Sequence, residues 1–264
     1  MFYGKMYKQI IILLTGGDEM INKKNGIEFE FLKGTGNSSI NLVFVHGSGC
    51  NRFFLRSIHE EVSEYNCYFI DLPGHGNSDD TGYSFDNYVN AVSDFVKDLD
   101  NVILLGHSLG GTIVLAATAR NILSVKGSVI ISSGASFPKL DKEYMKKIHN
   151  NVVDMEYVAE CLGHMEDSAV QEAVAKFEGN KIIVIDFLID EVVDVKECLK
   201  DIKVPITIVT GGDEILTIVE YSELINEKVK NSKLVVIPKT RHMLPVVRRK
   251  ELAEFIVELI DKVS

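Results

Sequence analysis

The chain has 264 residues, of which 46% are hydrophobic and 25% are charged, so it can bury a large core and its composition argues against global disorder. Its formal net charge is −10, which argues against nucleic acid and anionic membranes as partners. We therefore expect one α/β domain with an insertion, or at most two domains, with an acidic surface.

The chain has four cysteines, and no two of them form a C-x-x-C pair. Their spacing matches neither a zinc site nor a disulfide framework. We therefore predict a reduced, cytoplasmic protein that holds no metal ion. The isolated Gly34-Thr35-Gly36 is not a dinucleotide fingerprint, so no cofactor is predicted either.

Residues 1–19 form an extension whose relevance the sequence does not establish. The apolar run at 10–14 follows two lysines and imitates a secretory signal, but it is short and no small-residue cleavage site follows it. No window reaches the roughly 18–20 apolar residues that a membrane-spanning helix needs. We expect no stable membrane insertion, and Met20 is an alternative start of translation.

After this extension, short apolar strands alternate with helical segments. Asn25-Gly26 predicts a tight hairpin turn between two strands. Strands that are apolar throughout are typical of a parallel sheet covered by helices on both faces. Strands are expected at 40–45, 68–70, 102–105 and 129–131, and helical spacing covers 52–64, 85–99 and the segment after Ser108.

The pattern changes near residue 134. Residues 139–199 are polar and helical in periodicity, with one ambiguous apolar run at 182–185. Strand–helix alternation resumes at 205–209 and continues through a strand at 234–237 to a helix at about 249–262. The predicted fold class is α/β, with a mostly parallel central sheet and helices on both faces. Its core comprises 20–134 and 201–264, and 135–200 is an all-helical insertion.

The segment 106–110, Gly-His-Ser-Leu-Gly, lies between a predicted strand and a predicted helix. A G-x-S-x-G sequence in that context is typical of a nucleophile elbow. The two outer glycines permit a very tight turn because they lack a Cβ. The turn presents Ser108 at the N-terminus of a helix, where backbone N–H groups favour developing negative charge. We therefore predict that Ser108 is a nucleophile.

Several motifs in one order resemble the α/β-hydrolase fold family over residues 20–264. They are His46-Gly47, the segments 71–78 and 106–111, an acid after Gly211, and His242 near the end. This family uses the chain order serine, acid, histidine. The resemblance also implies that the helical insertion at 135–200 is a cap or lid over the site.

The resemblance implies that His242 is the base, since a serine hydroxyl needs an adjacent base to react. Two neighbouring residues compete for the role of the acid. The family's spacing from Gly211 favours Glu214, whereas the commoner use of aspartate favours Asp213. Consecutive side chains diverge, so only one of these two can face His242.

Two backbone N–H groups, those of Leu109 and Ser48, are expected to form the oxyanion hole. Gly47 and His107 are expected to lie beside the substrate, although the turn should direct the His107 side chain away from Ser108. His46 and His75 are expected to organise turns near the site, and the segment 71–78 to be structural.

Together these features predict a serine hydrolase that cleaves a small or medium carboxylic ester through an acyl-enzyme intermediate. The same triad could instead hydrolyse a thioester, an amide or a C–C bond, or transfer an acyl group. A third hypothesis is a hydrolase-like protein that binds a small ligand with little turnover. The sequence leaves the physiological substrate and the oligomeric state open.

Overall fold

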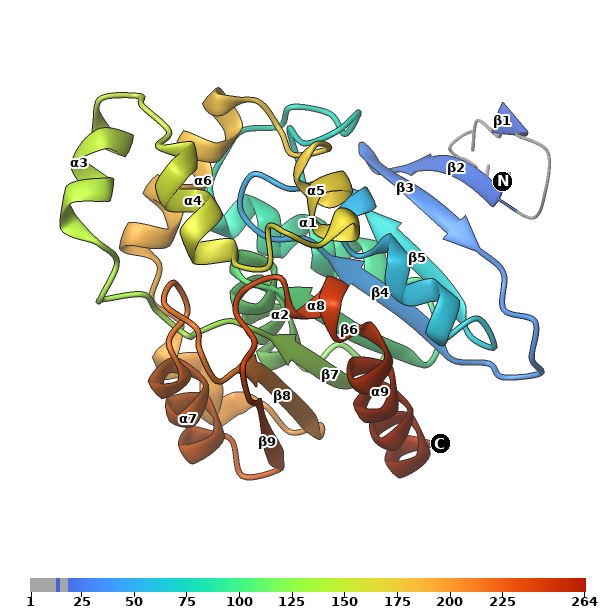
Figure 1. Ribbon diagram of the computed structural model, residues 1–264. Coiled ribbons are helices and arrows are strands. Elements are labelled where there is room, and N and C mark those ends of the chain that lie inside the picture. Colours follow the sequence, from blue (N-terminus) through green and yellow to red (C-terminus); the bar gives the residue numbers. More distant parts are fainter. Residues whose placement is uncertain (1–12, 15–18) are drawn as a thin grey trace, which may run out of the picture.

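The computed structural model describes residues 13–14 and 19–264, and its centre is a nine-stranded sheet in the order β1-β2-β3-β5-β4-β6-β7-β8-β9 (Figure 1). The strands from β4 onward pair in parallel, and the first three pair antiparallel. The strands are β1 (Leu13–Leu14), β2 (Glu19–Lys24), β3 (Ile27–Leu32), β4 (Asn41–Val45), β5 (Asn66–Ile70), β6 (Val102–His107), β7 (Val125–Ile131), β8 (Ile206–Gly211) and β9 (Ser232–Ile237).

Helices connect and cover these strands. The α-helices are α1 (Phe85–Val96), α2 (Leu109–Ala119), α3 (Lys142–His149), α4 (Met155–Leu162), α5 (Ser168–Val174), α6 (Asn180–Val192), α7 (Val219–Lys228), α8 (Leu244–Val247) and α9 (Arg249–Val263). Three 3₁₀ helices are η1 (Arg52–Phe54), η2 (Arg56–Glu61) and η3 (Lys196–Asp201). The predicted mostly parallel α/β sheet is thereby confirmed.

The predicted hairpin joins β2 to β3. Asn25 and Gly26 both have positive φ, 52° and 86°, which is the backbone that a tight two-residue hairpin turn requires. The extension predicted at 1–19 lies mostly outside the described residues. Within it, Leu13 and Leu14 pair with Ile21 and Met20 of β2.

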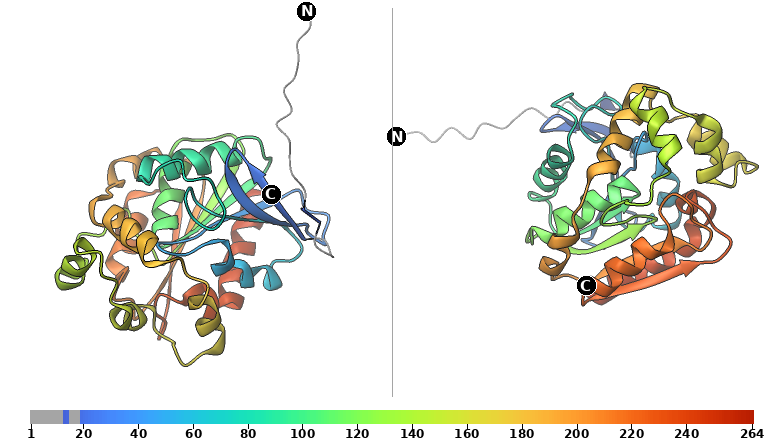
Figure 2. Two further views of the ribbon diagram at one scale, coloured as in Figure 1. Left: turned by 90° about the horizontal axis from the view of Figure 1, so that it is seen from above. Right: turned by 90° about the vertical axis from the view of Figure 1, so that its left-hand side faces the viewer.

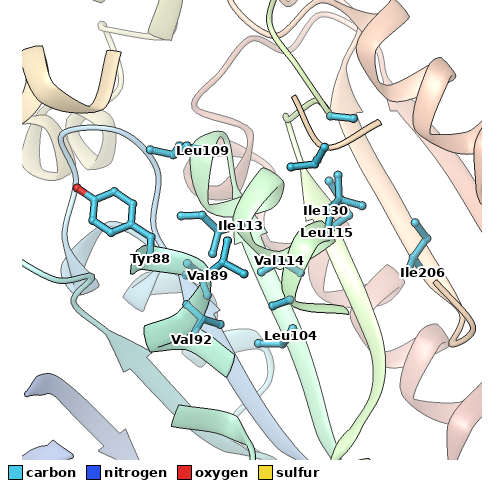
Figure 3. Close-up of a cluster of buried hydrophobic side chains, with 14 of the residues drawn as sticks. Tyr88, Val89, Val92, Leu104, Leu109, Ile113, Val114, Leu115, Ile130 and Ile206 are labelled. Atoms are coloured by element: carbon cyan, nitrogen blue, oxygen red, sulfur yellow. The ribbon is translucent and has the colours of Figure 1, made fainter. Parts of the chain in front are cut away.

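The core has two layers, one on each face of the sheet (Figure 2). Alternate residues of β4 point to opposite layers, as the pleat of a strand dictates: Val43 and Val45 to one, Leu42 and Phe44 to the other. The first layer holds α1 and α2 against the sheet, and Figure 3 shows their side chains meeting those of β6 and β7. Helix α9 and η2 cover the second layer.

The segment 52–64 is helical, but it forms the two short 3₁₀ helices η1 and η2 instead of one α-helix. Its first turn is fixed from outside the segment, because the backbone N–H and the guanidinium of Arg52 both donate to the buried Asp71. Asn51 caps the same turn by accepting from the Phe53 N–H. These contacts favour tight three-residue turns over a continuous α-helix.

Four α-helices, α3 to α6, lie between β7 and β8, within the range 135–200 predicted for the insertion. They gather at one end of the molecule (Figure 1). The ambiguous run at 182–185 is part of α6. The next element, η3, packs against α2 through contacts of the core layer that contains Leu199. Within the described residues, no helix is long and apolar enough to cross a bilayer.

Candidate active site

Ser108 occupies the sharp turn between β6 and α2. Its backbone has φ 53° and ψ −126°, a strained conformation for a residue with a side chain. A Cβ at Gly106 would lie 2.2 Å from the Gly110 carbonyl oxygen, and one at Gly110 would lie 2.3 Å from that of His46. The turn therefore requires glycine at both positions, and this packing fixes Ser108 at the carboxyl edge of the sheet.

Hydrogen bonds on both sides of Ser108 hold this strained turn. Its N–H donates to the carbonyl of Ile131 at 3.0 Å, which ties it to the end of β7. Its carbonyl accepts from the Ser133 hydroxyl at 2.6 Å. Because the backbone N–H and carbonyl of Ser108 are both hydrogen-bonded within the protein, these contacts fix the backbone of the turn.

His242 lies in the loop after β9. It is a buried residue, with only 3% of its surface exposed. Its Nδ1 is 3.2 Å from both carboxylate oxygens of Glu214, which follows β8. The Thr217 hydroxyl is also 3.2 Å from Nδ1. An acceptor at Nδ1 favours the tautomer that leaves Nε2 free to accept a proton.

Asp213, the other candidate acid, does not face the histidine. Its side chain is exposed, and its backbone N–H donates to the Thr240 carbonyl at 3.0 Å. Glu214 is only 7% exposed. The structure therefore brings Glu214 to His242 and leaves Asp213 on the surface, in line with the divergence of consecutive side chains.

The loop at 46–50 lies against the turn that carries Ser108. A Cβ at Gly47 would come within 2.9 Å of the Ser108 Cβ, so glycine allows this close approach. The backbone N–H groups of Ser48 and Leu109 donate to no acceptor within the described residues. Both are therefore available to a ligand oxygen.

A pocket joins these groups to the insertion. Gly47, Ser48, His107, Ser108 and His242 line one side of it. Most of its remaining walls are apolar or aromatic, from Phe54, Phe137, Leu140, Tyr157, Val158, Leu162, Phe177, Ile183, Phe187 and Leu216. A pocket with these walls suits an apolar group of a ligand next to a polar reacting centre.

His107 packs directly against His242, with ring centroids 4.5 Å apart. Its Nε2 donates to the His242 carbonyl at 3.0 Å. Burial, followed by the neighbouring His242, holds the pKa of His107 well below its usual range, so it is neutral. His107 therefore lines the pocket as expected, and it also braces the His242 loop, which sequence reasoning did not predict.

His46 and His75 both organise turns through hydrogen bonds. His46 accepts from the Leu72 N–H, and burial holds its pKa well below the usual range. His75 has acceptors at both ring nitrogens, Pro73 O and the Asp186 carboxylate, which only a protonated ring can satisfy. Burial opposes that charge, but the bond to Asp186 and its charge raise the pKa of His75.

Two acidic residues of α6 reach the site, and sequence reasoning missed both. Asp186 accepts from the Gly49 N–H at 2.8 Å, and Asp190 accepts from the Ser48 hydroxyl at 2.6 Å. The available signal was their spacing of four residues within an otherwise apolar stretch of helix, which places them on one face.

Metal-binding residues do not gather in the parts of the chain that the structure describes: no group of three or more His, Cys, Asp or Glu side chains is placed to hold an ion. Cys50 and Cys161 line the pocket as free thiols. Burial raises the pKa of both, to about 11 for Cys161. Neither is therefore a thiolate nucleophile at neutral pH.

Comparison with known proteins identifies the family to which this chain is similar. Residues 42–255 match the model described as the alpha/beta hydrolase family. A lipase-esterase related protein from Clostridium acetobutylicum has a similar structure, with a TM-score of 0.85 and 34% identity over 89% of this chain and 99% of that one.

Curated relatives carry several activities in their names. Pimeloyl-[acyl-carrier protein] methyl ester esterase of Shewanella woodyi is 36% identical over 103 residues, which is 39% of each chain. The chain thus matches about two fifths of that relative's length. Proline iminopeptidase of Saccharolobus solfataricus is 26% identical over 270 residues, 86% of each chain.

Proposed function

The chain belongs to the α/β-hydrolase family, and we propose that it is a serine hydrolase that cleaves a carboxylic ester of small or medium size. One observation carries this proposal. Ser108 on its strained turn and His242, backed by the Glu214 carboxylate, line one pocket whose other walls are mostly apolar.

In the proposed reaction, His242 takes the proton of the Ser108 hydroxyl as that oxygen attacks the ester carbonyl. Glu214 orients the imidazole and stabilises its charged form. The N–H groups of Ser48 and Leu109 bind the negative oxygen of the tetrahedral intermediate. His242 then protonates the leaving alcohol, and water releases the acid from the acyl-enzyme by the same steps.

The names of the relatives support the ester substrate. The methyl ester esterases share their matched segment with this chain, and the structural relative from Clostridium acetobutylicum is described as lipase-esterase related. A thioester, an amide or a C–C bond remains an alternative substrate for the same residues. We place the reaction in the cytoplasm, with no metal ion or cofactor.

Labelling with a fluorophosphonate, together with hydrolysis of short-chain p-nitrophenyl esters, tests the proposal. We expect the wild type to be labelled and active, and the Ser108→Ala variant to lose labelling and to fall in kcat by about 10⁴–10⁶. Equal melting temperatures will show that the variant is folded. A folded wild type that is neither labelled nor active contradicts the proposal and favours the ligand-binding hypothesis.

A further inference from the structure

Helix α6 presents two carboxyl groups to the loop at 46–50. Asp186 and Asp190 lie one helical turn apart, and they are 0% and 5% exposed. Each bonds a neighbouring residue of the loop, Gly49 and Ser48. Ile183 of the same helix also packs on Gly49, where a Cβ would lie 2.5 Å from its Cγ1.

The two carboxyl groups differ in how far their oxygens are paired. Asp186 has three partners, because Gly49 and His75 bond its Oδ2 and the Tyr88 hydroxyl donates to its Oδ1 at 3.0 Å. Among the described residues, the Asp190 carboxyl group has one partner, the Ser48 hydroxyl on its Oδ2. Its Oδ1 is buried and has no hydrogen-bond partner among the residues that the structure describes.

The position of Asp190 gives this unpaired oxygen a function. Asp190 lines the same pocket as Ser108 and His242, where the surrounding walls are mostly apolar. An anchor for Ser48 needs only one carboxyl oxygen, so anchoring leaves Oδ1 unexplained. Buried polar atoms are normally paired in folded proteins, and an unpaired one on a residue that lines a pocket is a candidate contact for a ligand.

Burial also alters the protonation of the Asp190 carboxyl group, and thereby the kinds of ligand group with which it can pair. It raises the pKa of Asp190 to about 8, against the lowering effect of the Ser48 hydrogen bond. Near neutral pH the group therefore exists in both protonation states. A ligand hydroxyl can pair with either state, because it both donates and accepts, and an ammonium group pairs with the ionised one.

We propose that Asp190 is a specificity-determining residue that binds a hydroxyl or amino group on the acyl chain of the substrate. This inference rests on the proposed esterase function. Asp190 bonds the side chain of Ser48, whose N–H faces the ester oxygen in the proposed reaction. The recognised group therefore lies close to the ester carbonyl, on one of the first few carbons of the acyl chain.

Matched esters test this inference. We compare kcat/KM for the p-nitrophenyl esters of butanoate, 3-hydroxybutanoate and 3-aminobutanoate, using both enantiomers of the substituted acids. The wild type is expected to prefer at least one substituted ester over butanoate by about 10-fold or more, since a buried group left unpaired penalises the unsubstituted ester. The hydroxyl and amino arms identify the donor.

Two variants separate recognition from positioning. In Asp190→Leu neither carboxyl oxygen remains to pair with the substituent, so the preference is expected to fall below about 3-fold. In Ser48→Ala the carboxyl group remains, so the preference persists whatever happens to the overall rate. An absent preference in the wild type, or one that Asp190→Leu retains, overturns the inference even where butanoate is hydrolysed.

A binding measurement needs neither turnover nor an Asp190 variant. Butanamide, 3-hydroxybutanamide and 3-aminobutanamide are titrated into the Ser108→Ala protein and followed by thermal shift. At least one substituted amide is expected to bind about 10-fold more tightly than butanamide. Equal binding of all three overturns the inference, and this result is independent of whether the protein is an esterase.

Discussion

The carboxyl edge of the sheet and helix α6 of the insertion both contribute to the candidate site, but they do so through different kinds of contact. At the edge, Gly106 and Gly110 meet across a turn of five residues. On the cap, Asp186 and Asp190 bond loop residues that are 137 and 142 positions away in the chain. Under the two proposals made above, the edge supplies the reacting groups and α6 supplies a group that selects the substrate.

The largest expected effect tests the edge. Glu214→Gln keeps the shape of the side chain but removes the charge that orients His242, so kcat is expected to fall by about 10⁴. Asp213→Asn is the matched control, because Asp213 is exposed and does not contact the histidine, and its kcat should change less than about 3-fold. Steady-state kinetics on p-nitrophenyl butanoate measure both. A larger loss in Asp213→Asn reverses the assignment of the acid.

The next effect tests how firmly the cap is attached. Asp186→Asn removes the negative charge that pairs with the buried His75 and is expected to cost about 3–5 kcal/mol in the free energy of unfolding, measured with urea. Glu191→Gln is the matched control on α6, because its bond to His149 is largely exposed and is worth at most about 1 kcal/mol.

The loss in the free energy of unfolding in Asp186→Asn is expected to depend on pH, and the direction follows from the pKa of His75. Burial acts to lower the pKa of His75, but the hydrogen bond and the charge of Asp186, with help from the Pro73 carbonyl, outweigh it and raise the pKa in the folded state. The ion pair therefore stabilises the fold fully below the unfolded pKa, and this contribution is lost as pH rises through the folded value. The deficit of Asp186→Asn should be larger at pH 6 than at pH 9, and a constant deficit contradicts this account.

A smaller effect contrasts two glycines. Gly110→Ala forces a methyl group to within 2.3 Å of the His46 carbonyl oxygen, so we expect a loss of about 1–3 kcal/mol in the free energy of unfolding and a loss of activity. At Gly179, which precedes α6, a methyl group in Gly179→Ala would meet no other described residue within 4 Å apart from its two chain neighbours. Thermal melts should show a clear fall only for Gly110→Ala, and equal falls contradict the packing argument.

The parts of the fold that the sequence predicts are those that a few neighbouring residues determine. The hairpin at Asn25-Gly26 and the turn around Ser108 depend on backbone conformations that a few adjacent residues determine. The same logic fails at 52–64, where periodicity predicts a helix but not its 3₁₀ form. That form depends on Arg52 and Asp71, which are 19 residues apart.

The candidate acids after β8 and the two aspartates of α6 show what the sequence alone does not predict. Spacing narrows the acid to two neighbours, and only the direction in which each side chain leaves the loop separates Glu214 from Asp213. Asp186 and Asp190 match no motif, because their roles depend on loop residues that the fold alone brings near. The positions proposed for catalysis therefore follow from motifs in the sequence, whereas the position proposed for substrate recognition does not.

The smallest expected effect concerns Asp190. This one residue is expected to influence both the stability of the fold and the choice of substrate. The folded pKa of Asp190 is about 8, well above the roughly 3.9 of an unfolded aspartate. The folded state therefore retains a proton that the unfolded state releases, and Asp190 lowers stability progressively as pH rises from about 4 to 8.

Asp190→Asn removes this titration, so its melting temperature should exceed that of the wild type at pH 9 by about 3 °C or more, with a smaller difference at pH 5. Asp213→Asn, which is exposed, is the control, and a difference that does not change with pH contradicts the assignment. The variant should gain stability at high pH and weaken any preference for the amino ester, as expected where a binding residue costs stability. Gly110→Ala should lose both stability and activity, which distinguishes a residue that builds the edge from one that serves recognition.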